Sequence, residues 1–362
     1  MMYVPMLKTR AEEMRVAREM HTCFSSNMVP LFEIINELYK PSYKKDSQGE
    51  FVYEQRKTRK VKVKIEPTKE DIITLPTINS LVDGKLMFID YFRFSIEKYG
   101  RNISFRKAEL SFDLNNDLEL YKNKLLEVTK YSNMIPVISL KPECSFPKPD
   151  LIRFVAELQK NTAHMALRIT EEWIDYTKDI IPRLREQDFL FLDVEEQNPE
   201  VKFMEIQEVL ELYKGCKLIL LNSPRKLSLR NGEYPEHAWT DLINNCAREV
   251  AMDNKLDGYG DYCGLKDAMP TNEGSNGMGA ALALLYDYKQ NAFYSYCNHD
   301  TSLGMSGYNM LIPLIKADEP LLNPEGDCPG YEKIHSLIGT GNWNTWHHIN
   351  AKRYLHQVYK NM

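Results

Sequence analysis

The chain has 362 residues, a formal net charge of −5 and seven scattered cysteines without a CxxC pair. This length suits one large α/β domain, and the mild negative charge excludes a surface that is basic throughout, as non-specific nucleic-acid binding requires. The odd, unclustered cysteines indicate reduced thiols rather than a disulfide framework or a zinc site. No apolar run approaches the roughly 18 residues that span a bilayer, and no signal segment is evident. We therefore expect a soluble cytoplasmic protein without a membrane partner.

Eight short apolar runs recur along the chain, each followed by a polar or charged residue. Runs that are apolar at successive positions are typical of parallel strands buried on both faces. We therefore predict an α/β fold, a single TIM-type (β/α)8-barrel domain over residues 1–362. In chain order the runs are 3–7 before Lys8, 28–32 before Glu33, 86–89 before Asp90, 134–138 before Ser139, 165–167 before Arg168, 189–192 before Asp193, 216–222 before Ser223 and 256–260 before Asp261.

Amphipathic segments of high helix propensity separate most of these runs. Helices are expected at residues 9–21, 117–128, 150–160, 201–213 and 242–252, and Gly215 is placed to end the fourth of them. A ninth apolar run, at residues 293–297, exceeds what an eight-stranded barrel needs. It predicts either a side hairpin or a strand count that is wrong by one.

Residues 36–81 differ in composition from the rest of the chain and are expected to form an insertion after the second strand. Within them, the sequence RKVKVKI at 59–65 alternates strictly between basic and apolar residues. Such alternation is typical of a half-exposed strand, so we predict a β-hairpin with a strongly basic open face. Lysines that protect an edge strand would explain it. The alternative is contact with a nucleic acid, a protein partner or another anionic partner.

Residues 265–362 are predicted to form a C-terminal loop and helix extension. The segment 271–279, rich in Gly, Asn and Ser, is expected to be a loop, and it lacks the Gly-Lys-Ser/Thr of a phosphate-binding P-loop. Further on, residues 339–348 present two Trp and two His before a helix expected at 349–359. Adjacent side chains at a helix start point in different directions, so one of His347 and His348 could face a pocket while the other packs. The alternative is that these aromatic residues only anchor the helix.

The carboxyl ends of barrel strands meet on one face, so polar residues that follow the runs should converge there. Together they would supply oxygen ligands for a divalent cation, positive charge for a phosphate and a carboxylate for proton transfer. Glu195 shares the strand face of Asp193 and is a further candidate. The alternative is a structural network of salt bridges. The converging set is Lys8, Glu33, Asp90, Arg168, Asp193 and Asp261.

Gly260, Asp261 and Tyr262 form a compact candidate site. Gly260 allows a backbone or ligand to come close, while Asp261 and Tyr262 project on opposite faces of the strand. A turn with a capping Asp is the alternative. Ser223 has no Gly-x-Ser-x-Gly context, so we expect a hydrogen-bonding hydroxyl there rather than a nucleophile.

Six short motifs resemble, in order, the beta protein family of bacteriophages and bacteria. The resemblance spans nearly the whole chain, and it implies a setting of conflict between phage and host, without an established reaction. The residues that it implies are Lys8, Glu33, Arg168, Asp261, Tyr262 and His348, with His347 beside it. The motifs are YVPMLK (3–8), PLFEI (30–34), IPV (135–137), LR (167–168), GDY (260–262) and WHH (346–348).

Two hypotheses follow. In the first, the barrel mouth binds and hydrolyses an anionic, phosphate-bearing substrate, either a small molecule or a nucleic acid. In the second, the protein is a non-catalytic interaction protein and the strand-end charges are a structural network. Closed pairs of Arg or Lys with carboxylates would favour the second hypothesis. In the first, Lys8 and Arg168 bind the anion, Glu33, Asp193 and Asp261 hold Mg or Mn or act as base, His348 is the acid, and Tyr262, Trp346 and His347 contact the substrate.

Overall fold

The computed structural model describes residues 1–56, 59–141, 144–212, 215–272 and 279–362. Eight parallel strands close into a barrel in the order β1-β11-β9-β8-β7-β6-β5-β2, which confirms the predicted TIM-type barrel. Each of the eight apolar runs contributes one strand. The strands are β1 (Met2–Lys8), β2 (Leu31–Ile34), β5 (Met87–Tyr91), β6 (Met134–Ser139), β7 (Ala166–Ile169), β8 (Phe189–Asp193), β9 (Lys217–Leu221) and β11 (Gly258–Asp261).

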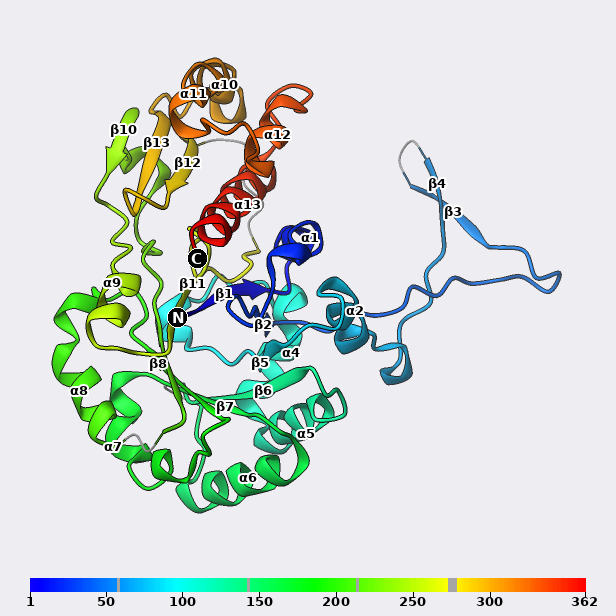
Figure 1. The fold of residues 1–362 in the computed structure, drawn as a ribbon. Helices are drawn as coiled ribbons and strands as arrows, with labels where there is room; N and C mark the ends of the chain where they lie inside the picture. The colour runs from blue at the N-terminus through cyan, green and yellow to red at the C-terminus, as the bar shows by residue number, and fades with distance from the viewer. Residues whose placement is uncertain (57–58, 142–143, 213–214, 273–278) are drawn as a thin grey trace.

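Helices surround the barrel on its outside (Figure 1). Each buries an apolar stripe against the strands, as α6 does with Leu151, Phe154, Val155 and Leu158 at helical spacing. The five predicted helices correspond to α1, α5, α6, α8 and α9, although α9 begins later than predicted and residue 213 lies outside the described ranges. The helices around the barrel are α1 (Ala11–Glu19), α2 (Thr74–Leu81), α4 (Phe105–Asn116), α5 (Leu118–Val128), α6 (Lys148–Asn161), α7 (Ile174–Thr177), α8 (Phe203–Leu212) and α9 (Ala247–Asp253).

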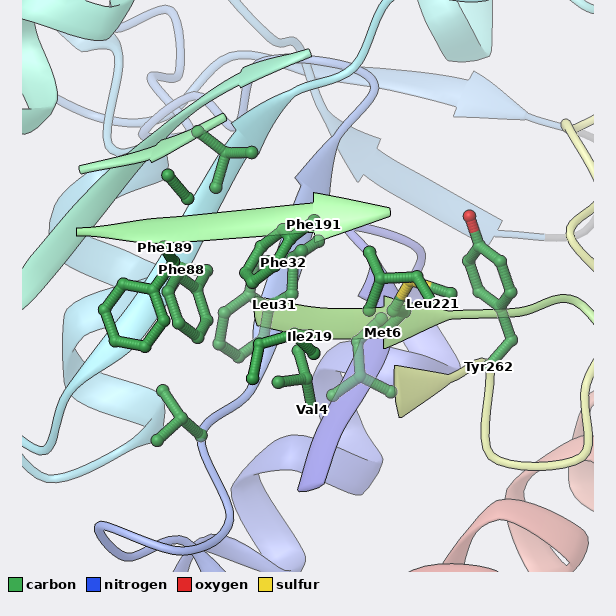
Figure 2. Close-up of a cluster of buried hydrophobic side chains, with 14 of the residues drawn as sticks. Val4, Met6, Leu31, Phe32, Phe88, Phe189, Phe191, Ile219, Leu221 and Tyr262 are labelled. Atoms are coloured by element: carbon green, nitrogen blue, oxygen red, sulfur yellow. The ribbon is translucent and has the colours of Figure 1, made fainter. Parts of the chain in front are cut away.

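The interior of the barrel is a packed apolar core (Figure 2). The ring of Phe88 lies edge-on to Phe189 and Phe191, with centroids 4.8 and 4.9 Å apart. Gly260 lets β11 approach β1, because a Cβ atom there would lie 2.4 Å from the carbonyl oxygen of Val4. The barrel is therefore filled rather than open, and its polar side chains gather at the carboxyl ends of the strands.

The predicted basic hairpin is an arm that projects away from the barrel (Figure 1). Its two strands, β3 (Tyr53–Arg56) and β4 (Arg59–Lys62), pair antiparallel. The arm closes at its base, where the Ile73 amide donates to the Leu38 carbonyl at 2.8 Å. The predicted insertion, 36–81, is longer than this arm, because α2 within it buries its apolar side chains in the barrel core.

The C-terminal part of the chain forms a second lobe beside the barrel. Its three-stranded sheet has the order β10-β13-β12, with β10 (His237–Thr240), β12 (Ala281–Asp287) and β13 (Ala292–Asn298). The ninth apolar run is β13, which forms a side hairpin with β12. The predicted loop and helix extension, 265–362, therefore also contains a sheet, and one strand of that sheet comes from an earlier part of the chain.

Four helices complete this lobe and enclose a second core around the stacked rings of Trp346 and Tyr308. Most of the predicted loop at 271–279, residues 273–278, lies outside the described residues. Within the described ranges, no helix combines the length and apolar character that a bilayer crossing requires. The helices of the lobe are α10 (Tyr308–Ala317), α11 (Glu319–Leu322), α12 (Pro329–His335) and α13 (Trp343–Asn361).

Candidate functional site

Strand alternation decides which residues reach the barrel interior. Val4 and Met6 of β1 point inward (Figure 2), and Lys8 continues that series at the carboxyl end. On β11, Gly260 and Tyr262 take the inward positions, so Asp261 between them faces outward. The other strand-end residues that reach the interior are Glu33, Asp90, Ser139, Arg168 and Asp193.

Arg168 is the centre of this buried cluster. Its Nη1 atom lies 2.6 Å from Glu33 Oε1 and 2.9 Å from Asp90 Oδ2. Its Nε and Nη2 atoms lie 2.9 and 2.7 Å from Asp193 Oδ2. The Ser139 hydroxyl donates to Asp90 Oδ2 at 2.6 Å. One guanidinium thus binds carboxylates from three strands.

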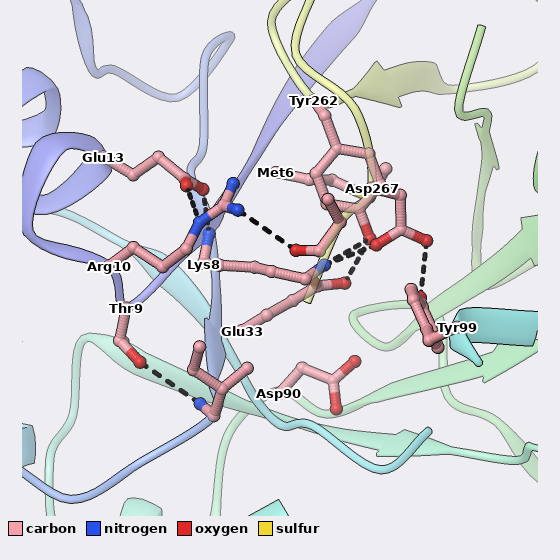
Figure 3. Close-up of polar contacts among 12 residues, drawn as sticks. Met6, Lys8, Thr9, Arg10, Glu13, Glu33, Asp90, Tyr99, Tyr262 and Asp267 are labelled. Atoms are coloured by element: carbon pink, nitrogen blue, oxygen red, sulfur yellow. Dashed lines mark hydrogen bonds and ion pairs between the residues drawn. The ribbon is translucent and has the colours of Figure 1, made fainter. Parts of the chain in front are cut away.

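Lys8 completes the cluster on its other side (Figure 3). Its Nζ atom lies 2.5 Å from both Glu33 Oε2 and Asp267 Oδ1. The Tyr262 hydroxyl donates to Glu33 Oε1 at 2.7 Å. The ring centroids of Phe92 and Tyr262 lie 4.3 and 4.4 Å from Lys8 Nζ, close enough for cation–π attraction. Lys8 is therefore enclosed by acceptors and aromatic rings.

A short helix, α3 (Ile96–Tyr99), covers the cluster from the solvent side. Lys98 Nζ lies 2.8 Å from Glu195 Oε1 and 2.8 Å from Asp267 Oδ2. The Tyr99 hydroxyl donates to Asp267 Oδ2 at 2.7 Å. Glu195, the further candidate from the sequence, thus belongs to this outer layer and not to the barrel interior.

The electrostatics of the cluster favour ionised pairs. Burial raises the pKa of Glu33, but Lys8 and Arg168 outweigh it and hold the value below its ordinary range. Burial likewise raises the pKa of Asp193, but Arg168, Lys141 and Lys98 outweigh it and lower the value. Burial also raises the pKa of Asp90, and there Arg168 only partly offsets it. Asp90 is thus the carboxyl of this group that is easiest to protonate.

Lys141, just after β6, is the most weakly paired lysine of this cluster. Its Nζ atom lies 3.7 Å from Asp193 Oδ2, and its pKa is lowered by burial and by the charge of Arg168. Lys8, Lys98 and Arg168 instead lie 2.5 to 2.9 Å from oxygens of Glu33, Asp90, Asp193, Glu195 or Asp267.

The cluster does not suit a divalent metal ion, which needs several free oxygen ligands. Glu33 and Asp193 direct their oxygens at Lys8 and Arg168, and Asp261 lies elsewhere. In the part of the chain that the structure describes, no three Asp, Glu, His or Cys side chains gather so that they could hold a metal. The expected Mg or Mn site of Glu33, Asp193 and Asp261 therefore does not match the geometry.

Asp261 instead fastens α13 to the outside of the barrel. Its Oδ1 atom accepts from the Tyr3 hydroxyl at 2.8 Å and from the Cys263 amide at 2.8 Å. Its Oδ2 atom accepts from the Tyr354 hydroxyl at 2.6 Å. Burial raises the pKa of Asp261 to about 6 although these bonds favour the ionised form. Its position behind the strand removes it from the expected catalytic group.

The three residues of the WHH motif enter three different environments. Trp346 packs in the second core, stacked on Tyr308 with ring centroids 4.3 Å apart. His348 is buried between α13 and α1, with Nε2 3.0 Å from Glu19 Oε2. His347 is exposed and lines a groove. The expected acid, His348, also lines this groove, but its side chain is 1% exposed and bound to Glu19, whereas His347 is the exposed histidine there.

This groove lies between the carboxyl face of the barrel and the start of α13, with a cavity volume of about 850 Å³. Of its polar lining, His347 and His348 are among the residues expected from the sequence. The others lie beyond the strand ends, where an apolar run carries no signal; Thr9, one residue after Lys8, is the nearest to one. The polar residues that line the groove are Thr9, Arg10, Glu12, Glu13, Asn36, Glu37, Ser104, Arg106, Lys107, Asn272, Asn344, His347 and His348.

The field around His347 is positive. Partial desolvation in the groove, and then the charges of Arg225, Arg10 and Lys266, lower the pKa of His347, so the ring is neutral at physiological pH. Arg225 is buried, and its Nε atom donates to the Tyr234 hydroxyl at 3.1 Å. Burial and Arg225 lower the pKa of Lys266 to about 8. Within the described ranges, neither Arg225 nor Lys266 has a carboxylate within ion-pair distance.

Comparison with known proteins adds a family. Two solved structures are similar over 72% of this chain: tryptophan synthase from M. tuberculosis (11% identity, 82% of that chain, TM-score 0.36) and dihydropteroate synthase from Anaplasma phagocytophilum (14% identity, 92% of that chain, TM-score 0.31). At these scores neither likeness bears on function. No curated protein matches the sequence. The model of the family described as Beta protein matches residues 3–360, nearly the whole chain. The chain belongs to the Beta protein family.

Proposed function

We propose that the protein binds a phosphate-bearing anion in the groove on the carboxyl face of its barrel. The observation that carries this proposal is the pairing of charges around the groove. Its carboxylates are engaged by cations of the protein, whereas the Arg106 guanidinium has no partner within the described residues and the field at His347 is positive. Arg106 is exposed at the groove, where a guanidinium without a counter-ion is free to pair with an anionic ligand.

The carboxylates that line the groove are already neutralised. Glu13 accepts from the Lys8 amide at 2.6 Å and pairs with Arg10. Glu37 lies 2.9 Å from Lys124 Nζ. Glu12 Oε2 lies 4.0 Å from Arg15 Nη1. These pairs leave the cations Arg106 and Lys107 to set the charge that an incoming ligand meets.

The geometry suits a nucleotide-sized ligand. A cavity of 850 Å³ is within the range of about 300–1,000 Å³ that is typical of small-molecule sites. Arg106 offers the planar fork that binds phosphate oxygens in pairs. The neutral His347 ring supplies one donor and one acceptor for a less charged part of the ligand. We therefore favour a nucleotide or a nucleic-acid end over inorganic phosphate alone.

The buried charge cluster is assigned a structural role in this proposal. Its closed pairs support the hypothesis in which strand-end charges form a salt-bridge network, and we propose no hydrolysis at Glu33, Asp193 or Asp261. Lys8 and Arg168 already form ion pairs with Glu33, so their hydrogen-bond donors are not free to bind a substrate. The network would hold the strand ends, and so the groove above them, in fixed positions.

Titration of a fluorescent ATP analogue into the full chain tests the proposal, with pyrophosphate as competitor. Arg106→Gln removes a charge-assisted contact, so affinity should fall at least about tenfold. Arg153→Gln on α6 removes the same charge from a side chain that is 77% exposed and remote from the groove, and it should bind as the parent does. Equal affinity of Arg106→Gln and the parent, or no binding by the parent, would overturn the proposal.

A role in conflict between phage and host is a further proposal, supported by family membership. Plating efficiency of a phage panel on cells that express the parent or Arg106→Gln would test it. We expect the parent to change plating efficiency and the variant to lose that effect. No effect of the parent on any phage in the panel would count against this role.

A further inference from the structure

The two faces of the projecting arm differ sharply in chemistry. In paired strands, residues directly opposite each other share a face, and alternate residues along a strand do the same. The pairs Tyr53 with Lys62 and Gln55 with Lys60 define one face of the ribbon. The bridges of Tyr43 with Lys64 and of Lys45 with Phe51 extend it toward the barrel. We call this set the lysine–aromatic face: Tyr43, Lys45, Phe51, Tyr53, Gln55, Lys60, Lys62 and Lys64.

This face carries lysines and aromatic rings, and none of its members is acidic. Lys62 Nζ lies 3.5 Å from the ring centroid of Phe51 and 5.6 Å from that of Tyr43. Lys45 Nζ lies 5.3 Å from the Phe51 centroid. These contacts agree with the shared face that the pairing implies. Phe51 is 36% exposed and Tyr53 is 54% exposed, so both rings are accessible.

The opposite face has a different composition. It carries Glu54, which pairs with Arg56 at 2.5 Å, and Val61 in the cross-strand position to Glu54. Arg59 and Lys44 also belong to this face by the same alternation. Basic residues thus lie on both faces, whereas the exposed rings lie on one. This asymmetry provides a matched control within the arm.

Charge is strongly segregated between the arm and the rest of the chain. Residues 40–65 contain nine Lys and Arg against three Asp and Glu, a net +6 in a chain whose total is −5. The arm extends away from the barrel, so this charge is presented to solvent (Figure 1). A lysine edge that only prevents strand pairing would not need accessible rings between the lysines.

We propose that the lysine–aromatic face binds single-stranded nucleic acid. Aromatic rings stack on bases without regard to sequence, and lysines between them hold the phosphates. Lys60, Lys62 and Lys64 recur about every 6.6 Å along the strand, so successive phosphates of an extended chain can each reach one. In a duplex the bases are stacked internally and could not use Phe51 and Tyr53. An acidic peptide would use the lysines but gain little from the rings.

Fluorescence anisotropy with labelled 20-mers of single-stranded DNA, single-stranded RNA and duplex DNA tests this inference on the full chain. Both single strands should bind more tightly than the duplex, and a difference between DNA and RNA would identify the preferred strand. Tyr53→Ala should weaken single-strand binding about 5- to 10-fold through lost stacking. Lys60→Gln with Lys62→Gln should weaken it at least tenfold and reduce the slope of log K against log salt by about 1.4.

The matched control is Arg59→Gln with Lys44→Gln, which removes the same charge from the opposite face. This control should retain single-strand affinity within about threefold, and circular dichroism should show all variants folded. Equal losses in the two double variants would reduce the effect to net charge and overturn the inference. So would tighter binding of the duplex, or full competition by a polyglutamate peptide, which would indicate an acidic protein partner instead. Arg153→Gln on α6 lies outside both the arm and the groove, so it should leave single-strand binding unchanged. The anisotropy titration reports the arm and the ATP-analogue titration reports the groove, so failure of one proposal is distinguishable from failure of the other.

Discussion

Arg168 offers the sharpest test of a structural role for the buried charges. Arg168→Gln would leave Glu33, Asp90 and Asp193 without their common cation at a site that is 2% exposed or less. Loss of one partner from a buried ion pair costs about 3–5 kcal/mol. Urea unfolding at pH 7 should show a loss of this size.

The control is Arg153→Gln, whose exposed pair with Asp150 is worth at most about 1 kcal/mol. If Arg168→Gln were as stable as this control, the cluster would not be a structural network. Its paired carboxylates would then be interpreted as a functional site that lowers the free energy of unfolding.

Asp261 predicts a specific pH dependence. Its pKa is raised from the ordinary value of 3.8 to about 6 by burial, so the native state holds a proton that the unfolded chain releases. Stability from this group is complete below about pH 4 and is lost as the pH rises through 6, by about 3 kcal/mol in total. Asp261→Asn cannot titrate there.

Urea unfolding of the parent and Asp261→Asn at pH 4, 5, 6 and 7 would measure this effect. The stability of the parent relative to the variant should decline from pH 4 to pH 7. A difference that stays constant, or one that grows with pH, would contradict a raised pKa for this buried carboxyl.

Asp261 lies apart from the other charged strand-end residues for one physical reason. The end of an apolar run marks where a strand ends but not which side the last residue faces, and one position reverses the side. In β1 the inward-facing residues have even numbers, and Lys8 is one of them. At the end of β11 the inward positions are Gly260 and, one residue beyond the strand, Tyr262. Asp261 thus follows a run as Lys8 does, yet faces Tyr354. Because Asp261 and Tyr262 project on opposite faces, the inward position of Tyr262 fixes the outward position of Asp261.

At the scale of elements, α13 is held to the barrel by polar contacts from two of its turns. His348 binds Glu19 of α1, and Tyr354 binds Asp261. His348→Ala should destabilise the protein by about 1–3 kcal/mol, because it removes a buried ring together with its contact to Glu19. His347→Ala, one residue earlier on the same helix, should change stability by at most about 0.5 kcal/mol.

The two variants should show the reverse order in ligand binding, since His347 is exposed in the groove, whereas His348 in the groove wall is buried and bound to Glu19. Thermal unfolding and the ATP-analogue titration on both proteins would establish this double contrast. A binding defect confined to His348→Ala would instead indicate that His348 is the ligand-binding histidine, as the family resemblance implied.

Elements were predictable where local pattern determines them. Apolar runs gave all eight barrel strands because a buried parallel strand must be apolar on both faces, and strict alternation gave the hairpin. The sheet of the second lobe was harder to predict from the sequence. Its strand β10 pairs with β13 although 51 residues separate Thr240 from Ala292, and such pairing is set by tertiary packing rather than local sequence. The groove was missed for a related reason, since its walls come from loops of the barrel and from the last helix.

At the scale of the whole molecule, the arm is an attachment to a barrel that does not need it. In the main hydrophobic core, the buried member that follows Ile34 in the sequence is Leu75, so the described part of the arm contributes no buried residue to it. The arm's base is already closed by main-chain hydrogen bonds, of which Lys40 N to Asp71 O is one at 2.8 Å. Replacing residues 41–70 with Gly-Ser-Gly should therefore shift the melting temperature by no more than about 2 °C.

The same deletion separates the two proposed binding sites. It removes the lysine–aromatic face, so single-strand binding should fall to the level of a buffer control, while the ATP analogue should bind the groove as before because Arg106 and His347 are intact. Circular dichroism melts and the two titrations on one preparation would measure all three quantities. Loss of both ligands together would mean that arm and groove form one continuous site, with the arm guiding a strand whose end enters the groove. A large drop in melting temperature would mean instead that the arm packs on the body of the protein and belongs to its fold.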